Sequence, residues 1–285
     1  MSQPNKHTIL ILGASGFIGN ALYKELLSYF STYGTYCTQD GIFGDNKVFF
    51  KYDVTKDQLG PILQEVRPSV VVSAIRGENN AVYAAHQALT AYVAQHHYCR
   101  VLLLSSAQVF DANLTLPKYE TDKPLAASDY GKHKLRLERL LLEHIPAQAT
   151  ILRLPVVLGV NSPRLIQLRQ AAKHKAAFEV YPNLIMSVTT ADKIAQQVHF
   201  IINRELDGIY HLASEDMIHH EDLFVEISEK LGSERPIFKS VYQSNDDAYL
   251  AILPKKNKLP KAYSITVSEV IEDCTLKEEI VTFKQ

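Results

Sequence analysis

Short runs of apolar residues alternate with longer amphipathic segments along the first half of the chain. The first run covers residues 8–12, and from residue 17 onward apolar side chains recur every three or four positions. A short continuous run is typical of a strand buried on both faces, whereas the longer period is typical of a helix. Further strands are predicted at 33–38, 48–52, 70–74, 101–104 and 150–154, and further helices at 58–66, 80–97 and 130–145.

This alternation predicts βαβ units, and hence an α/β fold with a doubly wound parallel sheet of the Rossmann type, whose ligands bind at the carboxyl ends of the strands. The rhythm weakens after Pro155. Helices are still predicted at 163–177, 191–204 and 221–231, and a strand at 208–213 that returns to the main sheet. We therefore expect a main domain formed by 1–160 and about 186–214, and a smaller C-terminal lobe formed by about 161–185 and 215–285.

The composition argues against several classes of function. The 285 residues are 46% hydrophobic, and their formal net charge is −1. Nucleic acid is not expected as a partner, because nucleic-acid-binding surfaces are usually basic. Neither the polar start of the chain nor any later stretch resembles a signal peptide or a membrane span. Cysteines at the distant positions 37, 99 and 274 favour free thiols in a reducing compartment, so we predict a cytoplasmic protein.

Three glycines, Gly13, Gly16 and Gly19, follow the first predicted strand at the spacing G-x-x-G-x-x-G and open the first predicted helix. Such a turn places backbone N–H groups and the positive end of a helix dipole beside a diphosphate. A Cβ would block the turn or the approach of the phosphate, and Gly19 would let the helix pack close to the strand. Three glycines alone also fit an ordinary turn, but their place between strand and helix predicts a dinucleotide site in the main domain.

Tyr130 and Lys134 stand four residues apart in a predicted helix and therefore face the same way. An adjacent ammonium lowers the pKa of a tyrosine, normally about 10, by favouring the phenolate. Tyr130 would then exchange a proton with a carbonyl or hydroxyl oxygen near neutral pH. Ser106 follows the strand at 101–104 and is placed to hydrogen-bond the same oxygen, although a serine pair there also fits a turn or a helix cap.

Together these segments resemble the extended short-chain dehydrogenase/reductase family. The resemblance rests on G-A-S-G-F-I-G near the N-terminus, L-L-L-S-S-A-Q-V-F in the middle and Y-G-K-H-K after it, in an order and spacing that match across residues 8–159. Within this family the chain is most similar to the dTDP-4-dehydrorhamnose reductase branch of sugar-nucleotide enzymes. The segments I-L-R-L-P and G-I-Y-H-L-A also match that branch, whereas the sequence after Gly232 matches poorly.

The resemblance implies that NADPH or NADH reduces a nucleotide-linked 4-keto sugar. Tyr130 would protonate the keto oxygen, Lys134 would bind the nicotinamide ribose and lower the Tyr130 pKa, and Ser106 would hold the substrate oxygen. The pyrophosphate would meet the glycine turn, the adenine would lie at Asp53 and Val54, and a homodimer is plausible. The residues that the resemblance places at the dinucleotide are Gly13, Ser15, Gly16, Phe17, Ile18, Gly19, Thr38, Asp53, Val54, Ala74, Ile75, Tyr130, Lys134 and Pro155. Of these, Ala74 and Ile75 would lie near the ribose and Pro155 near the nicotinamide.

Three departures from the family pattern bear on these roles. The segment after the fourth strand reads S-A-I-R and ends in Arg76, where the family often has N-A-A. His86 stands where an asparagine often helps a proton relay, and it fits either a relay or helix packing. The second strand ends in T-Y-C-T, without the acid that favours NAD. The absence of that acid favours NADP(H) slightly over NAD(H), unless the Asp40 carboxylate reaches the ribose.

Other interpretations stay open. A sugar-nucleotide epimerase would use the same residues, and a regulatory subunit would keep the fold and the dinucleotide without catalysis. No metal site is predicted, because the adjacent histidine pairs at 96–97 and 219–220 have no nearby cysteine or paired carboxylates. One basic cluster fits either a substrate diphosphate or a solvated face. It consists of Arg164, Arg169, Lys173 and Lys175.

Overall fold

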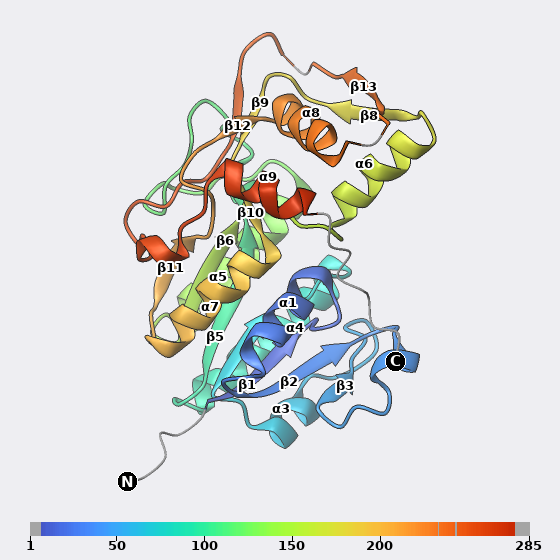
Figure 1. Ribbon diagram of the computed structural model, residues 1–285. Coiled ribbons are helices and arrows are strands. Elements are labelled where there is room, and N and C mark those ends of the chain that lie inside the picture. Colours follow the sequence, from blue (N-terminus) through green and yellow to red (C-terminus); the bar gives the residue numbers. More distant parts are fainter. Residues whose placement is uncertain (1–6, 233, 243, 277–285) are drawn as a thin grey trace.

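A seven-stranded parallel sheet forms the centre of the computed structural model, which describes residues 7–232, 234–242 and 244–276 (Figure 1). The strand order is β11-β6-β5-β4-β1-β2-β3, and every neighbouring pair runs parallel. The chain builds outward from β1 in one direction and from β4 in the other, which confirms the predicted doubly wound fold. The strands are β1 (Thr8–Leu12), β2 (Ser31–Tyr36), β3 (Phe49–Lys51), β4 (Val70–Ser73), β5 (Arg100–Ser106), β6 (Ala149–Leu154) and β11 (Gly208–His211).

Alternate residues of the central strands point to opposite faces of the sheet, and each face buries its own helices. Ile9 and Ile11 pack into one apolar cluster, whereas Leu10 and Leu12 pack into another. Burial on both faces is why these strands appear as continuous apolar runs in the sequence. Helices α1 (Phe17–Leu26) and α7 (Ala191–Asn203) cover the first face, and α3 (Gly60–Val66), α4 (Asn79–Gln95) and α5 (Asp129–His144) cover the second.

Short strands and three helices form a second part of the molecule, which we call the lobe (Figure 1). Its strands pair as β10-β7, β12-β9-β14 and β13-β8, and its helices share a third apolar cluster. The strands are β7 (Val156–Leu158), β8 (Ala177–Val180), β9 (Leu184–Met186), β10 (Val188–Thr190), β12 (Ile218–His219), β13 (Ile237–Ser240) and β14 (Ala248–Leu250). The helices are α6 (Pro163–Lys173), α8 (His220–Leu231) and α9 (Val267–Thr275). Three short helices are the remaining ones among the described residues: α2 (Asp40–Phe43), η1 (Ala107–Phe110) and η2 (Lys261–Tyr263).

Several predicted ends differ from the observed ones. The strand predicted at 208–213 does rejoin the main sheet, because β11 pairs with β6. The second strand ends at Tyr36, two residues earlier than predicted. The helix predicted at 163–177 ends at Lys173, since Lys175 takes a left-handed φ of 50° and the chain then enters β8. The short strands of the lobe and α9 were not predicted.

Candidate active site

The glycine turn joins β1 to α1 and leaves the first N–H groups of that helix beside a hollow. Gly13 has a φ of +82°, and its N–H donates to Thr35 Oγ1 on β2 at 2.8 Å. A Cβ on Gly19 would stand 2.1 Å from the Gly13 carbonyl oxygen, so this glycine lets the first turn of α1 pack against the backbone that directly follows β1. Gly16 precedes α1 and has no side chain to cap it. The turn therefore offers the open helix end that a diphosphate requires.

Two hollows meet in front of this turn. The central cavity has a volume of about 320 Å³, and the adjoining groove has a volume of about 280 Å³. Lining residues of the cavity include Phe17, Ile18, Gly19, Leu104, Ser105, Ser106, Tyr130, Lys134, Leu154, Pro155 and Arg164. Lining residues of the groove include Gly13, Ser15, Thr35, Cys37, Tyr52, Asp53, Val54 and Ile75. Both hollows share Gly16, Ala74 and Arg76. Every dinucleotide-binding residue expected from the sequence, except Thr38, borders one of the two.

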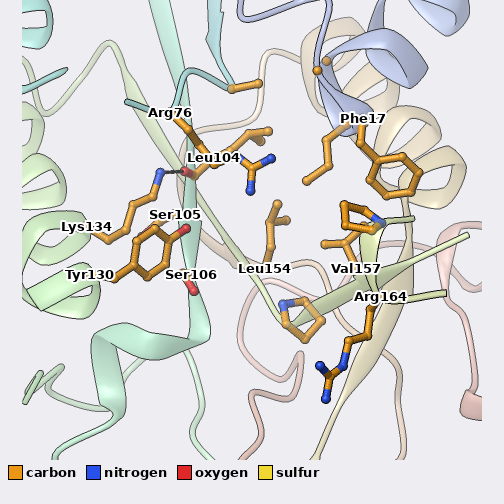
Figure 2. A pocket seen from close by; sticks show the side chains of 16 residues that line it. Phe17, Arg76, Leu104, Ser105, Ser106, Tyr130, Lys134, Leu154, Val157 and Arg164 are labelled. Atoms are coloured by element: carbon orange, nitrogen blue, oxygen red, sulfur yellow. Dashed lines mark hydrogen bonds between the residues drawn. The ribbon is translucent and has the colours of Figure 1, made fainter. Parts of the chain in front are cut away.

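Ser106, Tyr130 and Lys134 lie together on one wall of the central cavity (Figure 2). Ser106 is the last residue of β5, and the other two lie one turn apart near the start of α5. Lys134 Nζ donates to the Leu104 carbonyl oxygen at 2.9 Å and stands 5.8 Å from the centre of the Tyr130 ring. The fold therefore brings the three side chains into one place, at the carboxyl end of a central strand.

Gly131 explains how α5 brings Tyr130 so close to the end of β5. A Cβ at this position would stand 2.2 Å from the carbonyl oxygen of Gln108, in the short helix η1 that follows Ser106. Ser128 caps α5 by accepting from the Gly131 N–H at 3.0 Å. Ser106 likewise accepts from the Gln108 N–H at 3.2 Å. Gly131 was not among the residues predicted for the site, although its position directly after the tyrosine was the available signal.

The electrostatics of this wall differ from the expected ones. Burial raises the pKa of the Tyr130 phenol even though 41% of its surface is exposed, and the Arg76 guanidinium and a hydrogen bond with Ser106 act in the opposite direction. Burial and Arg76 lower the pKa of Lys134 to about 8, while Glu138 acts to raise it. The pKa of Tyr130 is therefore raised overall rather than lowered as expected, and the part that Lys134 plays in it stays a prediction. Lys134 Nζ is engaged by the Leu104 carbonyl, and Arg76 is a cation that acts to lower the Tyr130 pKa.

A buried ion pair supports this wall from behind. Glu138, one turn after Lys134 on α5, accepts from Arg153 Nη2 at 2.8 Å and from Arg153 Nε at 3.1 Å, and it also accepts from the Ser105 hydroxyl. Each charged side chain is only 2% exposed. Ser105 lies on β5 and Arg153 on β6, so this carboxylate ties α5 to both strands. The pair fixes where the helix presents its cavity-facing side chains.

The adjoining groove contains the residues predicted for the adenosine. Hydrogen bonds from the hydroxyl and N–H of Thr55, with Lys56 Nζ at 3.1 Å, lower the pKa of the Asp53 carboxyl to about 2. Thr38 is exposed beyond the end of β2, and Cys37 borders the groove instead. The placement of Thr38 follows from the early end of that strand. The side chain of Asp40 lies outside the part of the chain that the structure describes.

His86 is buried in α4 and packs against the sheet. Its Nδ1 contacts the Val82 carbonyl oxygen at 2.7 Å, and its Nε2 contacts the Ser73 hydroxyl at 2.9 Å. Burial lowers the pKa of His86 to about 4, so the imidazole is neutral at pH 7. A carbonyl only accepts, so Nδ1 carries the proton and the Ser73 hydroxyl donates to Nε2. This geometry favours helix packing over a proton relay.

Arg164, at the start of α6, lines the central cavity from the lobe side. Its guanidinium stands 4.5 Å from the centre of the Phe178 ring and 5.4 Å from that of Phe224, and its Nη2 donates to the Glu179 carbonyl oxygen at 3.1 Å. The rest of the basic cluster lies elsewhere: Arg169 and Lys173 border a different hollow, and Lys175 lies 3.8 Å from Glu234.

Two kinds of feature are absent from the described residues. Within 7–232, 234–242 and 244–276, no three or more histidine, cysteine or acidic side chains are grouped so as to hold a metal ion. Nor does any helix in these ranges have both the length and the apolar character needed to cross a bilayer.

Comparison with known proteins identifies the family. The sequence profile of the family described as RmlD substrate binding domain matches residues 7–266 of this chain. The chain belongs to this family. Among curated proteins, dTDP-4-dehydrorhamnose reductase from Aggregatibacter actinomycetemcomitans is 26% identical over 246 residues, which are 80% of each chain. Methionine adenosyltransferase 2 subunit beta from Danio rerio is 29% identical over 162 residues, which are 53% of this chain and 48% of that protein. The chain thus matches about half the length of this second relative.

Solved structures share the fold of this RmlD-family chain. dTDP-4-dehydrorhamnose reductase from Bacillus anthracis, in complex with NADP, aligns with a TM-score of 0.77 at 17% identity, over 96% of this chain and 98% of that one. UDP-glucuronic acid 4-epimerase from Bacillus cereus, in complex with NAD, aligns with a TM-score of 0.74 at 18% identity, over 93% and 96%. These likenesses agree with the sheet order and the two-sided helix packing described above.

Proposed function

We propose that this chain is an NAD(P)H-dependent reductase of a nucleotide-linked 4-keto sugar, with Tyr130 as the general acid. One observation carries the proposal: Ser106, Tyr130 and Lys134 share a cavity with the open end of α1 after the glycine turn. A dinucleotide-binding part of the chain (1–160 and about 186–214) and a substrate-binding part (about 161–185 and 215–285) belong to the same proposal, with β7 and β10 of the lobe counted in the first part. The RmlD family and the 26%-identical reductase support it.

The two hollows fit a nicotinamide dinucleotide. The glycine turn offers uncapped N–H groups where a diphosphate would lie, and a Cβ at Gly19 would close the turn. The groove at Asp53 and Val54 would take the adenosine, and the cavity at Pro155 would take the nicotinamide. The end of β2 presents Cys37 rather than an acid, which favours NADP(H) slightly over NAD(H).

When bound, the reduced nicotinamide supplies a hydride to the carbonyl carbon of the substrate. Tyr130 gives its hydroxyl proton to the carbonyl oxygen, so that C=O becomes CH–OH. The raised pKa of Tyr130 suits this direction, because the phenol keeps its proton at neutral pH until the substrate oxygen becomes basic. Ser106 donates a hydrogen bond to the same oxygen. After the transfer, the Ser106 hydroxyl donates to the phenolate that remains.

Lys134 has a separate role, in binding the ribose of the dinucleotide. Its hydrogen bond to the Leu104 carbonyl fixes the ammonium at the cavity wall, where its remaining N–H groups can meet ribose hydroxyls. From the opposite side, Arg164 is positioned to meet the diphosphate of the nucleotide sugar, since the Phe178 and Phe224 rings hold its guanidinium in place.

The direct test mixes the purified protein with NADPH or NADH and a panel of nucleotide-linked 4-keto sugars, and follows absorbance of the reduced nicotinamide. The proposal expects one reduced nicotinamide to be consumed for each hydroxyl formed. Replacing Ser106 with alanine should slow turnover about 10- to 100-fold, the usual worth of a hydrogen bond to a charged group. Binding without consumption of NADPH or NADH on any such sugar would contradict the proposal.

An epimerase is the first alternative, and the fold similarity to a 4-epimerase favours it. Epimerisation oxidises and re-reduces the same substrate, so it consumes no reduced nicotinamide overall. Chromatography of a nucleotide sugar incubated with the protein and NAD separates the two. Inversion of a hydroxyl without net change in absorbance would favour the epimerase.

A catalytically silent subunit is the second alternative. The match to methionine adenosyltransferase 2 subunit beta favours it, although that match spans about half of each chain. Such a subunit would bind NADPH and purify with a larger enzyme, yet turn over none of the panel. The retained Ser106, Tyr130 and Lys134 argue against it, because a lost activity would place no demand on those side chains. A homodimer remains a prediction for size-exclusion chromatography with light scattering.

A further inference from the structure

Arg76 is an exposed cation that the family resemblance does not explain. It follows β4 by three residues and borders both the central cavity and the adjoining groove. Figure 2 shows its guanidinium reaching from the loop into the open space of the cavity, above Tyr130 and Ser106. Its side chain therefore faces the ligand space rather than bulk solvent alone.

The junction of the two hollows restricts what can lie beside Arg76. Gly16, Ala74 and Arg76 line both hollows, so they mark the point where one opens into the other. A dinucleotide consists of two nucleosides joined through a diphosphate. If the adenosine occupies the groove and the nicotinamide occupies the cavity, the diphosphate must cross this junction.

The loop that carries Arg76 is packed directly against the glycine turn. A Cβ on Gly13 would stand 3.1 Å from the Ala74 carbonyl oxygen and 3.2 Å from Ile75 Cα. Gly16, at the N-terminus of α1, and Arg76 therefore both border the junction of the two hollows. Both are positive partners for a phosphate, one through the helix dipole and one through a full charge.

The charge of Arg76 has no fixed counter-ion nearby. Within the described residues, no carboxylate forms an ion pair with it, and the cavity lining contains Lys134 and Arg164 but no aspartate or glutamate. Asp53, in the groove, is engaged by Thr55 and Lys56. Arg76 also acts on both Tyr130 and Lys134, which places its charge within reach of the cavity wall. An anionic ligand would relieve the repulsion between Arg76 and Lys134.

We propose that Arg76 binds the diphosphate of the dinucleotide, opposite the N-terminus of α1. This inference rests on the proposed function, because it takes the dinucleotide as the ligand of the two hollows. Lys134 cannot replace Arg76 in this role without leaving the Leu104 carbonyl, and Arg164 is held in the lobe by Glu179 and two aromatic rings. Arg76 is the cation at the junction whose donors are uncommitted among the described residues.

The test is equilibrium binding by isothermal titration calorimetry, with NADPH and NADH titrated separately into the wild-type protein and three variants. Arg76→Gln removes the charge, Arg76→Lys keeps it without the two-pronged geometry, and Arg139→Gln removes an exposed arginine of α5 that borders neither hollow. Arg76→Gln should raise the Kd of both dinucleotides about 10- to 100-fold, as expected for one charged hydrogen-bonding partner. Arg76→Lys should raise the Kd of both dinucleotides less than Arg76→Gln does. Arg139→Gln should bind both with the wild-type Kd.

The pattern across ligands separates the possible outcomes. A diphosphate contact predicts the same loss for NADPH and NADH, and weaker competition by inorganic pyrophosphate in Arg76→Gln. A loss confined to NADPH would place Arg76 at the 2′-phosphate and overturn the inference, as would unchanged Kd values in a variant with wild-type circular dichroism. If the wild-type protein binds neither dinucleotide, the proposed function itself fails. These results therefore distinguish failure of the inference from failure of the function.

Discussion

The two sides of the central cavity are built on opposite principles. On the α5 side, Lys134 is 6% exposed and hydrogen-bonded to a strand carbonyl, and Glu138 and Arg153 form a closed pair behind it. On the other side, Arg76 is exposed and extends from a loop, and the lobe contributes Arg164, which the Glu179 carbonyl and two aromatic rings hold in place. On the α5 side the charges are buried and hydrogen-bonded, whereas on the other side Arg76 presents an exposed positive charge to the cavity.

This difference corresponds to two physical tasks. Proton transfer needs a hydroxyl held at a fixed point, and a buried network of hydrogen bonds supplies that fixity. Binding of a flexible, charged ligand needs groups that adapt and whose charge is neutralised by the ligand itself. We therefore expect changes on the α5 side to damage the fold or the chemical step, and changes on the other side to reduce affinity while the fold persists.

The largest effect on stability is expected from Glu138→Gln. It leaves Arg153 buried without a counter-charge, and breaking a buried pair in this way typically costs about 3–5 kcal/mol. Urea unfolding should show this loss in the free energy of unfolding. Glu179→Gln is a matched control, because its partner Lys239 lies 3.1 Å away in a pair that is 50–61% exposed, and its loss should cost less than about 1 kcal/mol. Equal losses in the two variants would contradict the difference between buried and exposed charges.

A double substitution sharpens the same point. Replacing Glu138 and Arg153 together with methionine removes both charges, and stability should return toward the wild-type value. If the double variant is as unstable as Glu138→Gln, the cost comes from lost packing rather than from the uncompensated arginine.

An intermediate effect is expected from Arg164→Gln. The KM for the nucleotide sugar should rise about 10- to 100-fold, because a charged hydrogen-bonding partner of the diphosphate is lost. The Kd for NADPH should stay unchanged, which is the reverse of the result expected for Arg76→Gln. Steady-state kinetics and calorimetry on both variants test whether the two arginines serve different ligands. A variant of Arg164 that loses affinity for NADPH would refute that division.

The smallest effect is a pH dependence of stability. Burial and Arg76 lower the pKa of Lys134 from 10.5 to about 8. Below pH 8 the folded and unfolded states are both protonated at this group, and the folded state bears the full cost of the buried charge. As the pH rises from 8 toward 10.5, the folded state releases the proton first, so stability increases.

The measurement is the free energy of unfolding of the wild type minus that of Lys134→Met, at pH 7.5 and at pH 9.5. This difference should rise by on the order of 1–2 kcal/mol in favour of the wild type. The subtraction removes contributions from other titrating groups, which both proteins share. A difference that is flat or falls with pH would mean that Lys134 is not a desolvated ammonium.

The main sheet and the location of the site could be predicted from the sequence. Strands buried on both faces give unbroken apolar runs, and a parallel sheet gathers its strand ends on one edge, so Ser106 and the glycine turn were expected close together. The lobe could not be predicted as well, because strands such as β9 and β10 are only three residues long. Runs of that length carry too little periodicity to distinguish strand from loop.

The electrostatic interactions within the site could not be predicted from the sequence. The i, i+4 spacing placed Tyr130 and Lys134 on one face of α5, but it could not show that the Leu104 carbonyl engages the ammonium. Nor could it show that Arg76, more than fifty residues before Tyr130, is a cation that acts on the phenol. Both facts depend on how β4, β5 and α5 pack together in three dimensions.

The most direct test of the account is the turnover of Tyr130→Phe with NADPH and a nucleotide-linked 4-keto sugar that the wild type reduces. The variant lacks only the hydroxyl, so it should bind NADPH as the wild type does. Its rate should fall about 10²- to 10⁴-fold, the range typical of a positioned general acid. A variant that binds NADPH and reduces the sugar at the wild-type rate would contradict the assignment of Tyr130 as the proton donor.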